Sequence, residues 1–258
     1  MPPVPDLNLD ANLAALEAEA THYPSTRATF LPDFVLYSFA TDVREHATAV
    51  QLLTPSTVPR AAFANARAAL ESALDLAFLV ADEKLFAYRG AQARVAELYE
   101  SVEMERRAAP LNPPLPTGAP APINAEDIIV ADALTWDRDA PGEGDALRRA
   151  WDMFPKNSGS TRKHWSLLPK KEVIEKAFTG DDAKAVGAMT SVIHAILSTA
   201  SHPRPRAGSR DIRQTEDGGF LLGTRASDPE MARQIAAFAC ALATQALKKR
   251  RKFGGIAT

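Results

Sequence analysis

The chain has 258 residues, 46% of them hydrophobic and 24% charged, so it can bury a core and has the balance of a folded globular protein. The formal net charge is −2 although residues 248–252 read Lys-Lys-Arg-Arg-Lys. The rest of the chain is therefore acidic, which is unlike a dedicated nucleic-acid binder with its wide basic face. A single cysteine, Cys240, excludes an intramolecular disulfide, and no apolar stretch is long enough to span a bilayer. We expect a cytoplasmic protein without membrane contact.

Helical signals follow one another along the chain. Aromatic residues make up only 7%, so alanine and leucine must supply much of the core, and alanine loses no side-chain entropy in a helix. Asp10 is the expected cap of the first helix, and Gly90 marks a kink or a break in the third. We expect helices over residues 10–20, 33–54, 57–107, 124–134, 145–153, 170–178, 182–202 and 228–249.

Two segments interrupt the helical pattern. Residues 108–123 hold six of the nineteen prolines and predict an extended connector and internal boundary. Asp217-Gly218 lies between short extended runs and predicts a small hairpin. The predicted fold is all-α, an irregular helical bundle with one Pro-rich connector and at most one small β-hairpin. It forms a single helical domain over 1–258, with N-terminal helices in 10–107, the linker 108–123, C-terminal helices in 124–249 and the basic tail 248–252.

Arg67 is the most unusual charged residue of the predicted helices. On a helical wheel it lies about 40° from the centre of the apolar stripe that starts at Phe63, and Glu71 lies about 80° away. We expect Arg67 to point toward the packed side, where a charge needs a partner. Glu71 can supply it. Three interpretations stay open: a half-exposed i,i+4 ion pair worth about 0.3–0.5 kcal/mol, a buried structural pair, and part of a working site.

A second polar stripe lies on the predicted helix 182–202. His194, Ser198 and His202 follow one another at intervals of four, away from the apolar face. If this stripe turns toward Arg67 and Glu71, these side chains form a buried network or the floor of a pocket. No metal site is expected, because the two histidines are separated by about 12 Å of helix rise. No oxyanion-hole element accompanies Ser198 and His202, and a hydrogen-bonded helix face is the alternative.

Two further segments are candidates for ligand contact. His164 and Trp165 follow a polar loop and can stack on a base or ligand ring, although such a Trp also anchors loops to a core. The basic residues Lys248, Lys249, Arg250, Arg251 and Lys252 are candidates for contacting nucleic-acid phosphates, with a solvated helix end as the alternative. No phosphate-binding loop or dinucleotide fingerprint is present, so we expect no cofactor.

The run Ala66-Arg-Ala-Ala-Leu-Glu-Ser-Ala-Leu-Asp-Leu-Ala-Phe-Leu resembles the Arg-x3-Glu helix of a helical bacterial family, catalogued as a domain of unknown function with the number five-six-seven-seven. The stretch from His164-Trp-Ser to Ile196-Leu-Ser-Thr-Ala-Ser-His202 resembles its second hallmark, a Trp before a short helix and then a helix ending in Ser-x3-His. The resemblance covers roughly residues 35–205. It implies that Arg67, Glu71, Trp165, Ser198 and His202 cluster, but not what they do.

We interpret the chain as a non-catalytic helical binding or regulatory protein, of the kind that serves as an accessory in bacterial stress or phage defence. The alternative is a metal-independent, toxin-like helical ribonuclease with a composite site. There His202 or His194 would act as general acid/base and Arg67 would stabilise phosphate charge. Helical ribonucleases of this kind carry Arg-x4-6-His on one helix, a spacing that none of the five histidines shows. The partner stays open between a second copy in a homodimer, an RNA and another protein.

Overall fold

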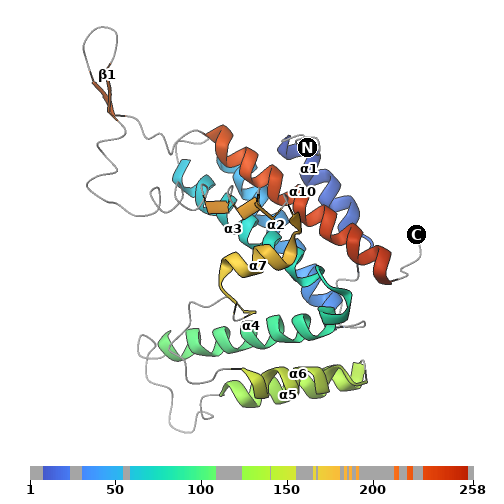
Figure 1. The fold of residues 1–258 in the computed structure, drawn as a ribbon. Coiled ribbons are helices and arrows are strands. Elements are labelled where there is room, and N and C mark those ends of the chain that lie inside the picture. The colour runs from blue at the N-terminus through green and yellow to red at the C-terminus, as the bar shows by residue number, and fades with distance from the viewer. Residues whose placement is uncertain are drawn as a thin grey trace. The chain divides into compact units, whose positions relative to one another are not determined.

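A computed structural model describes residues 8–23, 31–54, 59–108, 124–139, 141–154, 165–166, 168–180, 183–184, 186–187, 190–191, 212–214, 220–222 and 229–254. These residues are overwhelmingly helical (Figure 1), so the all-α prediction is confirmed. The helices are α1 (Leu9–Ala20), α2 (Leu31–Leu53), α3 (Pro59–Leu79), the 3-10 turn η1 (Glu83–Leu85), α4 (Phe86–Ala108), α5 (Ala125–Asp139), α6 (Glu143–Met153), α7 (Lys170–Ala177) and α10 (Pro229–Gly254).

The predicted small hairpin is present. Its strands β1 (Ile212–Gln214) and β2 (Phe220–Leu222) pair antiparallel, with Arg213 opposite Leu221. The predicted helix 182–202 is described only at 183–184, 186–187 and 190–191, which are helical. No helix in the described part of the chain has the length and apolar character needed to cross a membrane.

The first helix is capped by Asn8. The Oδ1 atom of Asn8 accepts hydrogen bonds from the backbone N–H groups of Asp10 and Ala11, at 3.0 and 3.2 Å. The predicted cap at Asp10 is wrong, because the extended backbone of Asn8 places its amide oxygen over the free N–H groups two and three residues later. Asp10 instead lies in the first turn, where a negative charge is favourable, and accepts a hydrogen bond from Gln51 at 2.8 Å.

The long third helix is interrupted before Asp82 and not at Gly90. α3 ends at Leu79, and the side chain of Asp82 caps η1 by accepting from the N–H of Lys84 at 2.9 Å. α4 then continues through Gly90. A Cβ at Gly90 would lie 2.7 Å from the Cα of Pro32. The break predicted at Gly90 as one of two alternatives is therefore wrong, and this glycine permits the close approach of two helices.

The chain divides into two compact units, each discontinuous in sequence. The first comprises Met1–Tyr23, Ser38–Ala81 and Val173–Thr258, and the second comprises Pro24–Tyr37 and Asp82–Glu172. The Pro-rich segment 108–123 leads from α4 to α5, which both belong to the second unit and pack on each other. This segment therefore lies within one unit and does not divide the two.

In the first unit, α10 packs against α3 and α1 (Figure 1). The buried faces are rich in small side chains that allow close helix packing. They include Ala62, Ala66, Ala69 and Ala73 of α3 and Ala232, Ala236, Ala239 and Ala243 of α10. Arg233 of α10 lies near Asp10, and Arg251 lies near Glu19. Because these contacts occur in the same order along both helices, α1 and α10 run parallel.

In the second unit, α5 and α6 form a helical hairpin that packs on α4. Gly142 precedes α6 with a φ of 95°, a left-handed conformation that favours glycine. Asp137 of α5 accepts hydrogen bonds from the N–H of Gly144 at 3.0 Å and from Arg148 at 2.6 Å. The hydrogen bond from Arg148 is the main reason that the pKa of Asp137 is lowered. These contacts join the start of α6 to the end of α5.

Candidate functional site

Arg67 and Glu71 form an ion pair at the edge of the packed face of α3. Arg67 Nε and Glu71 Oε1 are 3.0 Å apart, and each side chain is 40% exposed. The half-exposed i,i+4 pair is therefore the interpretation that the structure supports, with a value of about 0.3–0.5 kcal/mol. Arg67 is thus partly covered and partly exposed, because a long arginine stem can cover apolar surface while its charged end reaches water.

The predicted partners of this pair fall largely beyond what the structure describes. His164, His194, Ser198 and His202 all lie outside the described residues. Trp165 is described and is half-buried in the second unit. Its neighbour Ser166 is buried and accepts a hydrogen bond from the N–H of Leu168 at 3.3 Å. The predicted clustering of these residues stays a prediction.

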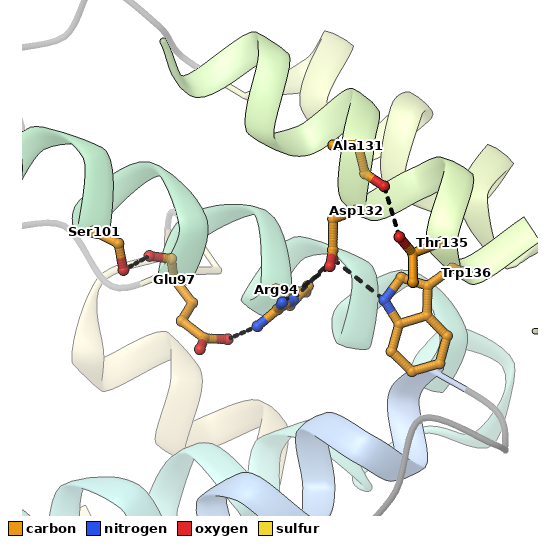
Figure 2. Close-up of polar contacts among 7 residues, drawn as sticks. All are labelled: Arg94, Glu97, Ser101, Ala131, Asp132, Thr135 and Trp136. Carbon is orange, nitrogen blue, oxygen red and sulfur yellow. Dashed lines mark hydrogen bonds and ion pairs between the residues drawn. The ribbon is translucent and has the colours of Figure 1, made fainter. Parts of the chain in front are cut away.

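The most enclosed polar arrangement among the described residues is an ion pair between α4 and α5, shown in Figure 2. Arg94 Nε lies 3.0 Å from Asp132 Oδ2, and Arg94 Nη2 lies 3.1 Å from Asp132 Oδ1. The two side chains are only 8% and 6% exposed. Two parallel charge-assisted hydrogen bonds of this kind are among the strongest polar contacts in proteins.

Further partners complete the surroundings of this pair. Arg94 Nη1 donates to Glu97 Oε2 at 2.9 Å, so each nitrogen of the guanidinium donates to a carboxylate. The indole Nε1 of Trp136 donates to Asp132 Oδ2 at 3.2 Å. The Cζ of Arg94 lies 5.7 Å from the centroid of the Phe34 ring, within the range of a cation–π contact. We call Arg94, Asp132, Glu97 and Trp136 the Arg94 network.

The Arg94 network holds a permanent charge in a buried position. Burial opposes the charged form of Arg94, but the hydrogen bonds and charges of Asp132 and Glu97 outweigh it, so the pKa of Arg94 is raised. The charge is compensated by carboxylates of the chain itself. The arrangement therefore fixes α4 against α5 rather than presenting a cation to a ligand.

Sequence reasoning missed the Arg94 network, although a signal for it exists. Arg94 lies on the face of α4 that also carries the buried residues Ala91 and Val95. Asp132 likewise lies among the buried residues Ile129 and Trp136 on α5. Arg67 stands out in the sequence because it is a charged residue near an apolar helix face. The same criterion applied to α4 and α5 would have selected Arg94 and Asp132. It would not have shown that they pair.

The basic residues 248–252 at the end of α10 point to different sides of the helix, so some are exposed and others contact the first unit. Lys249 Nζ donates to the carbonyl oxygen of Ala81 at 2.9 Å, and Arg251 Nε lies 3.0 Å from Glu19 Oε1. Lys248 and Lys252 are exposed, and Arg250 is half-buried. Two of the five predicted phosphate contacts thus hold the first unit together. Nucleic-acid contact by the run stays a prediction.

A further reactive group is the thiol of Cys240 on α10. It is fully buried, and burial with the nearby charge of Glu17 raises its pKa to about 12. The thiolate, which is the nucleophilic form, is therefore scarce near neutral pH. Among the described residues, no group of three His, Cys, Asp or Glu side chains could hold a metal ion.

No family model matches the chain, and neither a curated protein nor a solved structure matches it. The family resemblance, which is based on Arg67, Glu71, Trp165, Ser198 and His202, therefore rests on sequence motifs alone and stays a prediction. The geometry of the two units is what bears on function.

Proposed function

We propose that this chain is a non-catalytic helical binding or regulatory protein that acts through the outer surface of its second unit. The distribution of exposed apolar side chains supports this proposal. Six large apolar side chains are exposed among the described residues. Leu52 belongs to the first unit, and the other five belong to the second: Leu85, Met104, Val130, Leu134 and Met153.

Exposed apolar surface favours binding because its burial against a partner is worth about 25 cal/mol per Å². A surface also binds more tightly when its elements are already fixed, since less conformational freedom is lost on association. The Arg94 network fixes α4 against α5, and Asp137 fixes α5 against α6. The second unit therefore offers apolar side chains on a rigid support.

The charge arrangement favours binding over phosphate chemistry. A cation that stabilises the transition state of phosphodiester cleavage must be free to face the substrate. Arg67 is paired with Glu71, and Arg94 is paired with Asp132 and Glu97. The role in bacterial stress or phage defence stays a prediction.

Site-specific photo-crosslinking in cells tests the proposed surface. A photoreactive residue at Leu134 or Met153 should capture a defined partner, because both positions are exposed in the second unit. The same residue at Leu52, an equally exposed apolar position of the first unit, is the matched control and should capture none. Equal capture at Leu52, or capture at none of the three, would contradict the proposal.

A second test concerns the rival activity. Purified protein incubated with single- and double-stranded RNA and DNA should leave the nucleic acid intact. Cleavage that co-purifies with the chain and disappears in Arg67→Ala, while the variant keeps its melting temperature, would establish a nuclease and overturn the proposal.

A further inference from the structure

α5 has an outward face with apolar side chains at its centre. Its buried face carries Ile129, Asp132, Ala133 and Trp136. On the opposite side, Val130 is 44% exposed and Leu134 is 62% exposed. A helix that packs on α4 and α6 through one face needs only polar residues on the other, so two large apolar side chains there call for an explanation.

Charged residues of opposite sign stand at the two ends of this face. Asp127 and Arg138 are both exposed, and their spacing corresponds to about three helical turns and about 16 Å. They therefore lie on one line along the helix. Ala131 and Leu134 lie between them and are exposed as well. We call Asp127, Ala131, Leu134 and Arg138 the α5 stripe.

We propose that the α5 stripe binds the α5 stripe of a second copy of this chain, with the two helices antiparallel about a two-fold axis at the level of residues 132 and 133. In this register Asp127 faces Arg138 of the partner subunit, and Arg138 faces the partner subunit's Asp127. Ala131 faces Leu134 of the partner subunit, and Leu134 faces the partner subunit's Ala131.

Charge complementarity selects a second copy as the occupant. A two-fold axis brings the same surface of both subunits together, so the surface must complement itself when reversed. The α5 stripe complements itself, because the antiparallel arrangement places Asp127 opposite an arginine and Arg138 opposite an aspartate. A parallel arrangement would place Asp127 on the partner subunit's Asp127, where like charges repel.

Packing at the centre suits the same register. A leucine opposite an alanine lets two helices interlock, because the large side chain fills the space over the small one. Arg138 also pairs with the adjacent Asp139, at 2.9 Å. Arg138 is 75% exposed, so water screens this ion pair and the pair holds the guanidinium only weakly. The guanidinium is therefore available to a partner.

The expected dimer is weak. Stable interfaces bury about 1,200–2,000 Å² of total surface, and one pair of short helices buries less. Association should therefore vary with protein concentration. It does not depend on the proposed binding function: nuclease activity would overturn that function and leave this dimer unaffected.

A charge-swap experiment on the full chain tests the register. Sedimentation velocity across a concentration series should show a reversible dimer of the unmodified chain. Asp127→Arg and Arg138→Asp should each raise the dissociation constant at least about tenfold, because like charges then meet at both ends. An equimolar mixture of the two variants should form a one-to-one heterodimer, because every contact in the mixture again joins opposite charges.

Two apolar substitutions complete the test. Leu134→Asp should prevent association, whereas Leu52→Asp, the matched control on α2, should leave it unchanged. Circular dichroism confirms that each variant is folded. A monomer at every concentration, single variants that associate like the unmodified chain, or a mixture that stays monomeric would each overturn the proposal.

Discussion

Arg94 and Asp132 face each other through two hydrogen bonds of 3.0 and 3.1 Å, although they are 38 positions apart on helices separated by the Pro-rich segment. Both side chains are buried, so neither charge can be solvated if the other is removed. The contact closes a loop of sequence within the second unit that contains the whole Pro-rich segment. Removal of either side chain should therefore destabilise the second unit.

Asp132→Ala should lower the free energy of unfolding by about 3–5 kcal/mol, because it leaves the guanidinium of Arg94 buried without its main partner. Urea denaturation followed by circular dichroism measures the effect. Glu97→Gln is the matched control on the exposed side of the same guanidinium and should cost no more than about 1 kcal/mol. Equal losses in the two variants would show that Arg94 does not depend on Asp132.

The double variant Arg94→Met/Asp132→Leu should be more stable than Asp132→Ala, since apolar residues of similar size remove the buried charge together with its partner. The indole N–H of Trp136 then loses its acceptor, so recovery should be incomplete. A double variant no more stable than Asp132→Ala would mean that the carboxylate matters mainly to Trp136.

Arg67→Ala should change the free energy of unfolding by no more than about 0.5 kcal/mol, because Arg67 and Glu71 are both half-exposed neighbours on one helix. Arg94→Ala, measured alongside in urea, should cost several times more, because the buried carboxylate of Asp132 would lose its cationic partner and keep the neutral indole N–H of Trp136. A large loss in Arg67→Ala would restore the interpretation of a buried structural pair.

The contrast between these two arginines shows what sequence can predict here. Helical spacing correctly located most helices, because one buried face is enough to set the apolar period. It could not rank Arg67 against Arg94, since each lies near an apolar face and the difference arises from a carboxylate on another helix. Asp132 provides that carboxylate only after α4 and α5 pack together.

Helix ends show the same limit. Gly90 looks like a break because glycine is a poor helix former, but the close approach of Pro32 explains its presence. The actual break has a local signal in Asp82, a good cap residue, which accepts from the N–H of Lys84. Propensity alone does not distinguish a glycine that ends a helix from one that permits packing.

Gly90→Ala should destabilise the protein, although glycine to alanine within a helix usually stabilises it by about 0.5–1 kcal/mol. The added Cβ would lie 2.7 Å from the Cα of Pro32, and backbone cannot move aside cheaply. Overpacking of this kind costs about 1–3 kcal/mol. Gly187→Ala is the control, because its Cβ would lie 4.0 Å from its nearest neighbour, on Ile174. A melting temperature that rises in Gly90→Ala would refute the close packing.

Glu143→Gln should raise the melting temperature at neutral pH. Burial raises the pKa of Glu143 above its usual 4.5, and the charge of Asp33 raises it further, against a hydrogen bond from the N–H of Leu31. The folded state thus binds this proton more tightly than the unfolded chain does. The stability that this proton contributes to the folded state is complete below about pH 4.5 and is lost as the pH rises through the raised pKa of Glu143.

Glutamine does not titrate, and its side-chain oxygen can still accept a hydrogen bond from the N–H of Leu31. The gain in melting temperature should therefore appear at pH values above the raised pKa of Glu143 and vanish below about pH 4.5. Thermal unfolding of both proteins across a pH series measures it. Glu45→Gln, which removes a carboxylate at an exposed position of α2, is the matched control for the change of side chain. A gain of equal size at every pH would mean that titration of Glu143 is not its source.

Cys240 should react with a thiol reagent only when the first unit opens. The thiol is fully buried on α10, and its pKa of about 12 keeps it protonated at pH 8. The native protein should therefore react with 5,5′-dithiobis(2-nitrobenzoic acid) far more slowly than the denatured protein, and urea should accelerate the reaction in step with unfolding. Ala14→Cys adds a thiol on the exposed face of α1. In this variant one thiol per chain should react fast, while the thiol of Cys240 should still react slowly. Rapid reaction of the unmodified native chain would show that α10 is not packed against α1 and α3 as described.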